Sequence, residues 1–448
     1  MLDLKRTFLS LALATAASAG VPRGPLQAQD PQAVQAELAR LRARIDSLEA
    51  ALARLQPGGA RAEATDALAE LRAAAQQAAQ AGADTTLAPQ AETQFTGRQR
   101  SLQALNPEIS ANVDVFGHLN TDDAGNQNFV PREFEFSFQS SLDPYSRAKI
   151  FLAHHSAGPE LVPFEEGEGH EHAEEGEGGF EVEEGYVEWV GLPGGVTLKL
   201  GKFLQRFGTL NRWHAHALPF QSRSLPHLAF LGEESLGQTG GSVTWLLPIH
   251  GAGAYELTGE VTRSSNETLF GESARASGLA HLNAFWQLSR STDLDLGVSW
   301  TGGRYQTEEV DLDRNLFGVE GALTWRPPES GGYRGLVIRG GAMLLDGLVP
   351  HEGEAAPEAE RAKGFWSLAE LRLSERWYAG GRVDWSESPE DPEMTAWLFS
   401  PTLTWWQSEF VRLRLEYDLL GRSFLDDDEG RLWLQVTFAM GPHKHETY

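Results

Sequence analysis

The sequence predicts an all-β transmembrane barrel of about 16 antiparallel strands, preceded by an N-terminal α-helical coiled-coil segment. Three observations predict this class. Apolar and polar residues alternate with period two over most of the chain beyond residue 108, the alternating segments are even in number, and the connections between them alternate between short and long. The 448 residues include no cysteine and carry a formal net charge of −26. The composition therefore excludes a disulfide framework and a thiol nucleophile, and it argues against nucleic acid as a partner.

The first segment is expected to be a signal peptide over residues 1–19. Lys5 and Arg6 form a basic start, residues 8–17 are apolar, and Ala17-Ser18-Ala19 resembles a cleavage site. Cleavage after residue 28 is the alternative. The apolar run is too short for a membrane anchor, so we expect the chain to be exported.

Residues 30–82 are expected to form a periplasmic coiled coil, followed by a linker over 83–107 and a barrel over 108–448. Apolar side chains follow a heptad spacing of 4, 3, 4, 3, 4, 3. These oligomerisation residues are Val34, Leu38, Leu41, Ile45, Leu48, Leu52 and Leu55. So narrow an apolar seam requires partner helices, which favours an oligomer. A helical hairpin that folds back at the Pro57-Gly58-Gly59 turn is the alternative.

The strands of the predicted barrel are read from the alternation. In residues 411–419, valine, leucine and tyrosine occupy the odd positions, and Arg412, Arg414, Glu416 and Asp418 occupy the even ones. The same pattern gives sixteen strands, with 14 or 18 as alternatives. They are 109–118, 131–142, 146–156, 180–191, 194–205, 236–247, 251–263, 277–289, 292–305, 313–326, 333–347, 361–373, 376–387, 394–406, 409–420 and 430–440.

A soluble β-sandwich would also alternate, but the details favour a membrane barrel. The strands are long and charged on one face, and tryptophans such as Trp325 and Trp377 stand near strand ends, as in the aromatic girdles of outer-membrane barrels. If both termini are periplasmic, the short turns lie on the periplasmic side of the membrane and the long loops lie on the external side. A barrel of this size encloses water, which explains the charged residues within its strands.

The segment from Gly201 to His214 carries a resemblance to a known family. It reads Gly-Lys-Phe-Leu-Gln-Arg-Phe-Gly-Thr-Leu-Asn-Arg-Trp-His and resembles bacterial outer-membrane porins, in particular the phosphate-selective-porin-like group with its metal-regulated members. The resemblance covers residues 106–448 and implies a homotrimeric channel. Two features depart from it. The chain is acidic rather than basic, and either Phe438 or Tyr448 takes the place of the closing aromatic residue.

The resemblance to porins implies that the longest connection, residues 206–235, folds into the lumen. Its length and apolar content fit packing against the barrel wall better than free exposure. It ends with Glu233 and Glu234. We expect these acids to face wall arginines and to create a transverse field that weights ion selectivity. The wall residues of this constriction are Arg382, Arg412 and Arg414.

A metal-binding external loop is the second expectation for function. Between Ile150 and Leu198 there are twelve acidic residues and no lysine or arginine. Imidazole nitrogens and carboxylate oxygens together suit Zn²⁺ and similar divalent cations, although the spacing fixes no ligand set. The alternative is a solvated acidic loop that repels anions. The candidate ligands are His170, His172, Glu168, Glu171, Glu174, His214 and His216.

Together these features predict an outer-membrane porin for passive diffusion of ions and small hydrophilic solutes. It is expected to prefer cations, to favour divalent metals such as zinc, and to contact outer-membrane lipid and lipopolysaccharide. No cofactor is expected beyond a transient Zn²⁺ or other divalent cation. The chain carries none of the enzyme motifs sought, including a G-x-S-x-G elbow, a P-loop and His-Glu-x-x-His, so catalysis is not expected. The alternative is a structural tether in which the coiled coil is the functional part.

Overall fold

The fold is that of the computed structural model, which describes residues 107–120, 128–156, 161–164, 179–233, 235–249, 251–308, 310–330, 333–348 and 361–441. The predicted signal peptide, coiled coil and nearly all of the linker lie outside these residues. None of the helices in the described part of the chain is long and apolar enough to cross a membrane.

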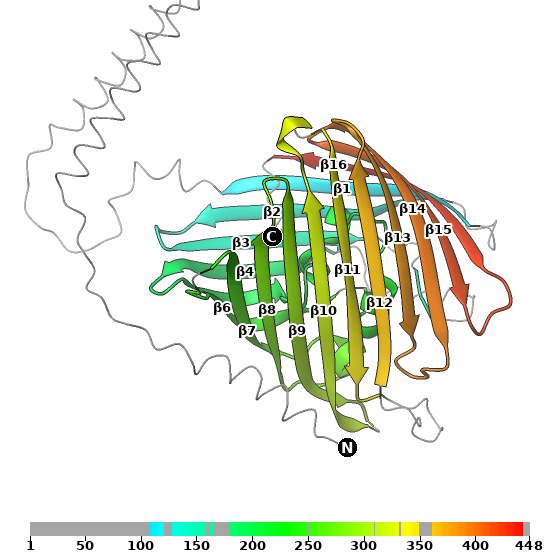
Figure 1. Ribbon diagram of the computed structural model, residues 1–448. Helices are drawn as coiled ribbons and strands as arrows, with labels where there is room; N and C mark the ends of the chain where they lie inside the picture. Colours follow the sequence, from blue (N-terminus) through cyan, green and yellow to red (C-terminus); the bar gives the residue numbers. More distant parts are fainter. Residues whose placement is uncertain are drawn as a thin grey trace, which may run out of the picture. The chain divides into compact units, whose positions relative to one another are not determined.

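The described residues form one closed antiparallel barrel of sixteen strands (Figure 1). Each strand pairs with its neighbours in the sequence, and β1 closes the barrel against β16. Every predicted strand is present, with each end within three residues of the predicted one. The strands are β1 (Glu108–Asn120), β2 (Asn128–Ser141), β3 (Ser146–His155), β4 (Glu181–Leu192), β5 (Val196–Leu204), β6 (Gly237–Leu246), β7 (Gly253–Arg263), β8 (Ala276–Gln287), β9 (Thr292–Gln306), β10 (Asp311–Trp325), β11 (Gly335–Asp346), β12 (Arg361–Arg372), β13 (Trp377–Glu387), β14 (Thr395–Ser408), β15 (Val411–Arg422) and β16 (Glu429–Met440).

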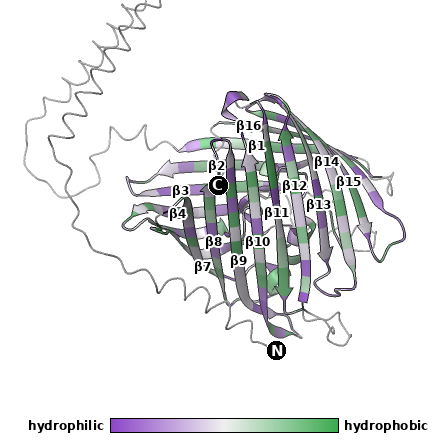
Figure 2. Ribbon diagram, in the orientation of Figure 1, coloured by the Kyte–Doolittle hydropathy of each residue, from purple (hydrophilic) through white to green (hydrophobic). Residues whose placement is uncertain are grey.

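The two faces of the barrel wall differ in chemistry. On β15 the side chains of Leu415 and Tyr417 are 45% and 40% exposed, whereas Arg414 and Glu416 are buried. Figure 2 shows the corresponding alternation of apolar and polar residues along the strands. A soluble sandwich buries its apolar faces and exposes its charges. The barrel does the reverse, which is the arrangement that a surrounding bilayer requires, so the sandwich alternative is wrong.

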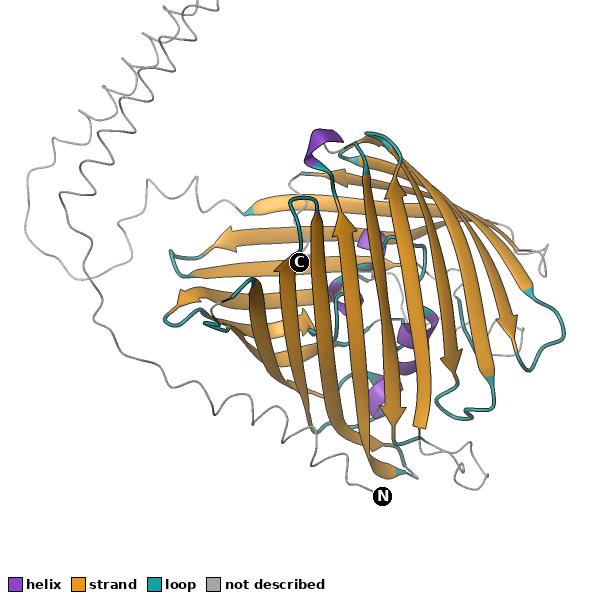
Figure 3. Ribbon diagram, in the orientation of Figure 1, coloured by secondary structure: helices purple, strands orange, loops and turns teal. Residues whose placement is uncertain are grey.

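The chain between β5 and β6 enters the barrel. This internal loop (residues 206–235) carries the short 3₁₀ helices η1 (Leu210–Arg212) and η2 (Ala215–Ala217) and the helix α4 (Leu225–Leu231), and Figure 3 shows helices in the space enclosed by the strands. Helix α4 packs against β11–β14 and against α5 (Glu267–Phe270). One further 3₁₀ turn, η3 (Pro328–Ser330), follows β10.

Apolar contacts hold the internal loop inside. Leu210, Trp213, Leu218 and Phe220 form a buried cluster with Trp366 and Leu368 of β12. Phe230 and Leu231 join a second cluster that reaches the walls of β8, β10 and β11. The prediction that this loop packs against the barrel wall is therefore confirmed. Several wall positions are apolar because they face the loop rather than water.

Two glycines and one asparagine shape the ends of this loop. Gly208 and Gly232 have φ of 68° and 73°, in the left-handed region that residues with a Cβ atom rarely adopt. Asn211 is fully buried, donates to Gln205 O at 2.8 Å and accepts from Leu236 N at 2.8 Å. One side chain thus links the residues on either side of the loop, which gives the asparagine of the Gly201–His214 segment a structural role.

Candidate functional site

Arginines of the lumen wall bind the backbone of the internal loop. Arg412 donates to His216 O at 2.6 Å, and Arg414 donates to Leu218 O at 2.8 Å. Arg382 donates to the carbonyl oxygen of Ser222 at 2.5 Å and to its hydroxyl oxygen at 2.8 Å. All three guanidinium groups are buried. A loop without regular structure leaves carbonyl oxygens unpaired, and these arginines satisfy them.

Acidic residues of the wall satisfy the loop's amide groups in the same way. Glu416 accepts from Gln221 N at 2.8 Å, and Asp384 accepts from Leu225 N at 3.1 Å. Three strands further along the wall from β13, Glu320 of β10 accepts from Thr209 N at 2.8 Å. The lumen charges that the alternation predicted as solvated are therefore, at these positions, partners of a buried backbone.

The three arginines of the predicted constriction contact the internal loop. Arg382, Arg412 and Arg414 each donate to a loop carbonyl group. Glu233 is described near the end of the loop, where its carbonyl oxygen accepts from Arg223 at 3.2 Å. Glu234 lies outside the described residues. The predicted effect of these acids on ion selectivity is not tested by these contacts.

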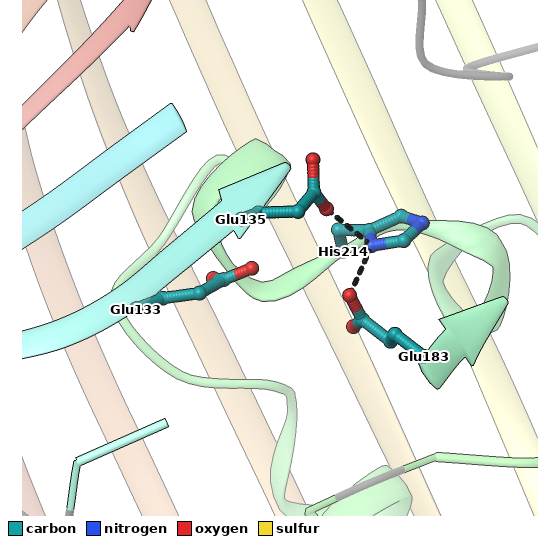
Figure 4. A group of neighbouring side chains, drawn as sticks. All are labelled: Glu133, Glu135, Glu183 and His214. Atoms are coloured by element: carbon teal, nitrogen blue, oxygen red, sulfur yellow. Dashed lines mark hydrogen bonds and ion pairs between the residues drawn. The ribbon is translucent and has the colours of Figure 1, made fainter. Parts of the chain in front are cut away.

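A Glu–His cluster (Glu133, Glu135, Glu183, Glu184, His214 and His216) occupies the other part of the lumen. Nδ1 of His214 lies 2.9 Å from Glu135 Oε2 and 2.8 Å from Glu183 Oε2. Its Nε2 lies 2.8 Å from Glu184 Oε1. Figure 4 shows the side chains of Glu135 from β2 and Glu183 from β4 converging on this ring from two sides. Nδ1 of His216 lies 2.9 Å from Glu133 Oε1.

Irregular strand pairing aims these carboxylates inward. The register between β3 and β4 moves from Phe151↔Glu184 to Leu152↔Val182, so Glu183 is an extra residue in a β-bulge. In a regular strand, adjacent side chains point to opposite faces. The bulge lets Glu183 and Glu184 both reach the same histidine.

A second irregularity lies beside Glu133. The pairs Asp114↔Glu133 and Phe116↔Val130 leave extra residues on β2, among them Arg132. Arg132 forms an ion pair with Asp114 and donates to Gln221 O at 2.5 Å. Both strands that supply carboxylates to the cluster are therefore irregular at the cluster.

The two histidines of the cluster have raised pKa values. Burial alone lowers the pKa of His214, but the carboxylates of Glu183 and Glu135 outweigh burial and raise it well above its ordinary value. Burial also lowers the pKa of His216, and Glu133 and Glu135 together raise it above the ordinary value. The neighbouring carboxylates therefore favour the protonated form of both rings.

The α4 end of the loop has the opposite electrostatics. Burial, with help from Arg223 and Arg382, lowers the pKa of His227 to about 3, and its Nδ1 lies 2.6 Å from Ser224 Oγ. Burial lowers the pKa of Arg223 to about 10 despite nearby glutamates. Arg223 donates to Leu210 O at 2.9 Å and Trp213 O at 2.8 Å, so it holds the loop together internally.

The predicted metal ligands are thus divided. His214 and His216 lie together in the lumen, whereas His170, His172, Glu168, Glu171 and Glu174 lie outside the described residues. Sequence reasoning missed Glu133, Glu135 and Glu183, whose ligand atoms lie with that of His214 within 4.8 Å of one another. The one available signal in the sequence was the alternation of residues 133–135. It puts Glu133 and Glu135 on the lumen face of the strand and Phe134 on the other face. It indicated a lumen position but no partner.

The comparisons with known proteins identify the fold but not the family of the chain. No family model matches the chain. A protein of Aquifex aeolicus described as an uncharacterized protein is 26% identical over 310 residues, a match that covers 60% of this chain and 63% of that protein. The chain thus matches less than two thirds of the length of this relative.

Several solved structures resemble the barrel, and one of them is a porin. Pseudomonas putida OprB superposes with a TM-score of 0.50 at 11% identity, over 77% of this chain and 96% of that one. An anion-selective porin from Comamonas acidovorans gives 0.49 at 9% identity, over 75% and 99%. The trimer form of OmpT from Vibrio cholerae gives 0.47 at 8% identity, over 75% and 99%. The likeness to OprB confirms a porin-like barrel fold. The phosphate-selective and zinc-regulated subtypes remain predictions.

Proposed function

We propose that this chain is a channel of the bacterial outer membrane that passes ions and small hydrophilic solutes by passive diffusion. The observation that carries the proposal is a closed barrel with an apolar exterior, a charged interior and a loop packed inside it. An apolar exterior suits a bilayer, and an internal loop narrows the lumen rather than replacing it with a continuous apolar core. The export signal expected at residues 1–19 supports the same location.

Conductance in planar bilayers tests the channel. Purified full-length protein should give stepwise conductance, and replacing residues 213–231 with a short Gly-Ser linker should increase each step because the internal loop is then removed. Conductance only in the shortened variant would support a plugged barrel with a tethering role. If neither protein conducts after correct folding is verified, the channel proposal is overturned.

A preference for cations is a finer part of the proposal. It is supported by 63 acidic against 37 basic residues and by the position of Glu233 in the internal loop. The reversal potential in a salt gradient should have the sign of a cation-selective pore. It should move toward zero in the double variant Glu233→Gln with Glu234→Gln. An unchanged potential would remove these two acids from the account of selectivity.

The external acidic segment and the oligomeric state complete the proposal. His170 and His172, with their neighbouring glutamates, are proposed to concentrate divalent cations such as Zn²⁺ at the pore mouth.

The heptad positions from Val34 to Leu55 are proposed to hold a homotrimer. Cross-linking of full-length protein should give trimers that are lost when Leu41 and Leu48 are replaced by aspartate.

A further inference from the structure

We propose that the Glu–His cluster binds a divalent transition cation, represented by Zn²⁺, between β2, β4 and the internal loop. The binding site lies inside the barrel and does not rest on whether the barrel conducts. Its ligands are Glu133, Glu135, Glu183 and Nδ1 of His214.

The arrangement of ligand atoms matches a single ion. Zinc binds imidazole nitrogen and carboxylate oxygen at about 2.0–2.2 Å, so two ligands of one ion lie roughly 3–4 Å apart. The four candidate atoms lie within 4.8 Å of one another. Rotation of the carboxylate groups is sufficient to close this set around an ion.

The second nitrogen of His214 is held as it is in many metal sites. A carboxylate oxygen can only accept, so Nε2 must donate its hydrogen to Glu184 Oε1, 2.8 Å away. Metal-bound histidines commonly donate their other ring nitrogen to a carboxylate, which fixes the tautomer and the ring orientation. Glu184 therefore turns Nδ1 toward the other three carboxylates as a ligand.

The cluster also makes two buried carboxylates share one hydrogen. Nδ1 carries at most one hydrogen, yet oxygens of Glu135 and Glu183 both lie within 2.9 Å of it. Oε2 of Glu135 is enclosed, its ion-pair partner is that shared nitrogen, and no donor among the described residues meets it in good hydrogen-bond geometry. Buried carboxylate oxygens are costly without a partner. A cation between the carboxylates supplies that partner to both.

The backbone gives independent support. The bulge at Glu183 and the irregular pairing beside Glu133 both occur where the strands reach His214. Bulges re-aim side chains and are frequent beside functional sites. Asp384 and Glu416 bind the loop backbone from strands that keep a regular register around them. The irregularity of β15 lies at its first residue, Val411, next to the turn from β14.

The mixture of donors selects the class of cation. Imidazole nitrogen with carboxylate oxygen suits Zn²⁺ and neighbouring transition metals, whereas Mg²⁺ and Ca²⁺ prefer oxygen ligands throughout. Glu183 is the most accessible of the ligands, with a side chain that is 20% exposed. It therefore marks the side from which an ion enters.

Zinc titration of the full-length protein in detergent, after removal of metal with a chelator, tests the site. The background should carry alanine in place of His170, His172, His443 and His445, so that the two His-x-His pairs outside the cluster do not contribute. We expect one Zn²⁺ per chain. Glu183→Gln should weaken binding about tenfold or more, and excess Mg²⁺ should not compete.

Glu181→Gln is the matched control, because it removes one charge from an exposed position two residues away on the same strand. It should leave the affinity within about twofold. Equal weakening by both variants, or no zinc binding in the background protein, overturns the site. Cobalt absorption gives a second measurement, since direct nitrogen coordination predicts visible bands that change in His214→Gln. Bands that do not change in this variant would also overturn it.

Discussion

His214 and His227 lie in the same internal loop, and both are buried, but their surroundings shift their pKa values in opposite directions. At His214 the carboxylates of β2 and β4 outweigh burial and raise the pKa. At His227 burial, Arg223 and Arg382 lower the pKa to about 3. Burial alone therefore does not determine the state of a lumen histidine. The charged groups that surround the ring decide the direction together with burial.

The two walls also use their charges differently. On the arginine side, β13 and β15 match loop carbonyl and amide groups with side chains almost one for one. On the acidic side, several carboxylates meet around one imidazole. The charged side chains on the arginine side hold the loop in place. On the acidic side there are more carboxylate oxygens than the loop has hydrogen-bond donors to pair with them. An additional cation therefore fits on the acidic side.

The largest expected effect comes from breaking the arginine side. In Arg412→Met with Arg414→Met, the carbonyl oxygens of His216 and Leu218 lose their donors and wall acids lose their partners. Removing one member of a buried charged contact costs about 3–5 kcal/mol, so the internal loop should undock while the barrel persists. Hydrogen exchange followed by mass spectrometry should show lost protection over residues 206–233.

Arg147→Met is the control for this prediction, because Arg147 of β3 donates to Glu188 of the neighbouring strand β4 at 2.5 Å. It should preserve loop protection. Protection that persists in the Arg412 and Arg414 variant would mean that the apolar clusters rather than the arginines hold the loop. Equal loss in the control would mean that the contacts with loop carbonyl groups are not what holds it.

A smaller effect should follow from acid. The docked loop keeps His227 neutral down to a pKa of about 3, whereas an undocked histidine takes up a proton near pH 6.5. Protons therefore favour the undocked state, and docking weakens as the pH falls from about 6.5 toward 3. By pH 4.5 the loss is about 2–3 kcal/mol. Hydrogen exchange corrected for its intrinsic pH dependence measures it.

Glu and Asp residues of the wall also titrate in this range, so the comparison with His227→Asn isolates the histidine. Asparagine can retain a hydrogen bond to Ser224 and cannot titrate. The variant should lose less protection between pH 7 and pH 4.5 than the unmodified protein. Parallel losses in the two proteins would assign the acid sensitivity to the carboxylates.

The contrast between wall and loop also explains how far the sequence could be read. Strand alternation is a local pattern. The face on which a residue such as Arg412 or Leu413 lies can be assigned from its neighbours in the sequence alone. All sixteen strands were therefore predictable. The apolar content of the internal loop was equally local, and it predicted the packing of Phe220 and Phe230 against a wall.

The partners of the lumen charges were not predictable in this way. The contact between His216 and Glu133 joins residues 83 positions apart, and it depends on where the loop crosses the lumen. The inward position of Glu183 depends on a bulge that violates the alternation used to assign faces. The alternation of apolar and polar residues identifies the strands of the barrel wall. It fails at the irregular positions that bring the Glu–His cluster together.

The smallest effect is expected where a charged contact lies away from the loop. Arg304 donates to Asp311 at 2.8 Å and to Asp313 at 3.0 Å, and these acids are 44% and 78% exposed. Exposed pairs contribute little because water and salt screen them. Arg304→Met should therefore leave both loop protection and the melting temperature unchanged within error. If it instead releases the loop as fully as the Arg412 and Arg414 replacements, the total positive charge of the barrel, rather than contact with loop carbonyl groups, controls docking.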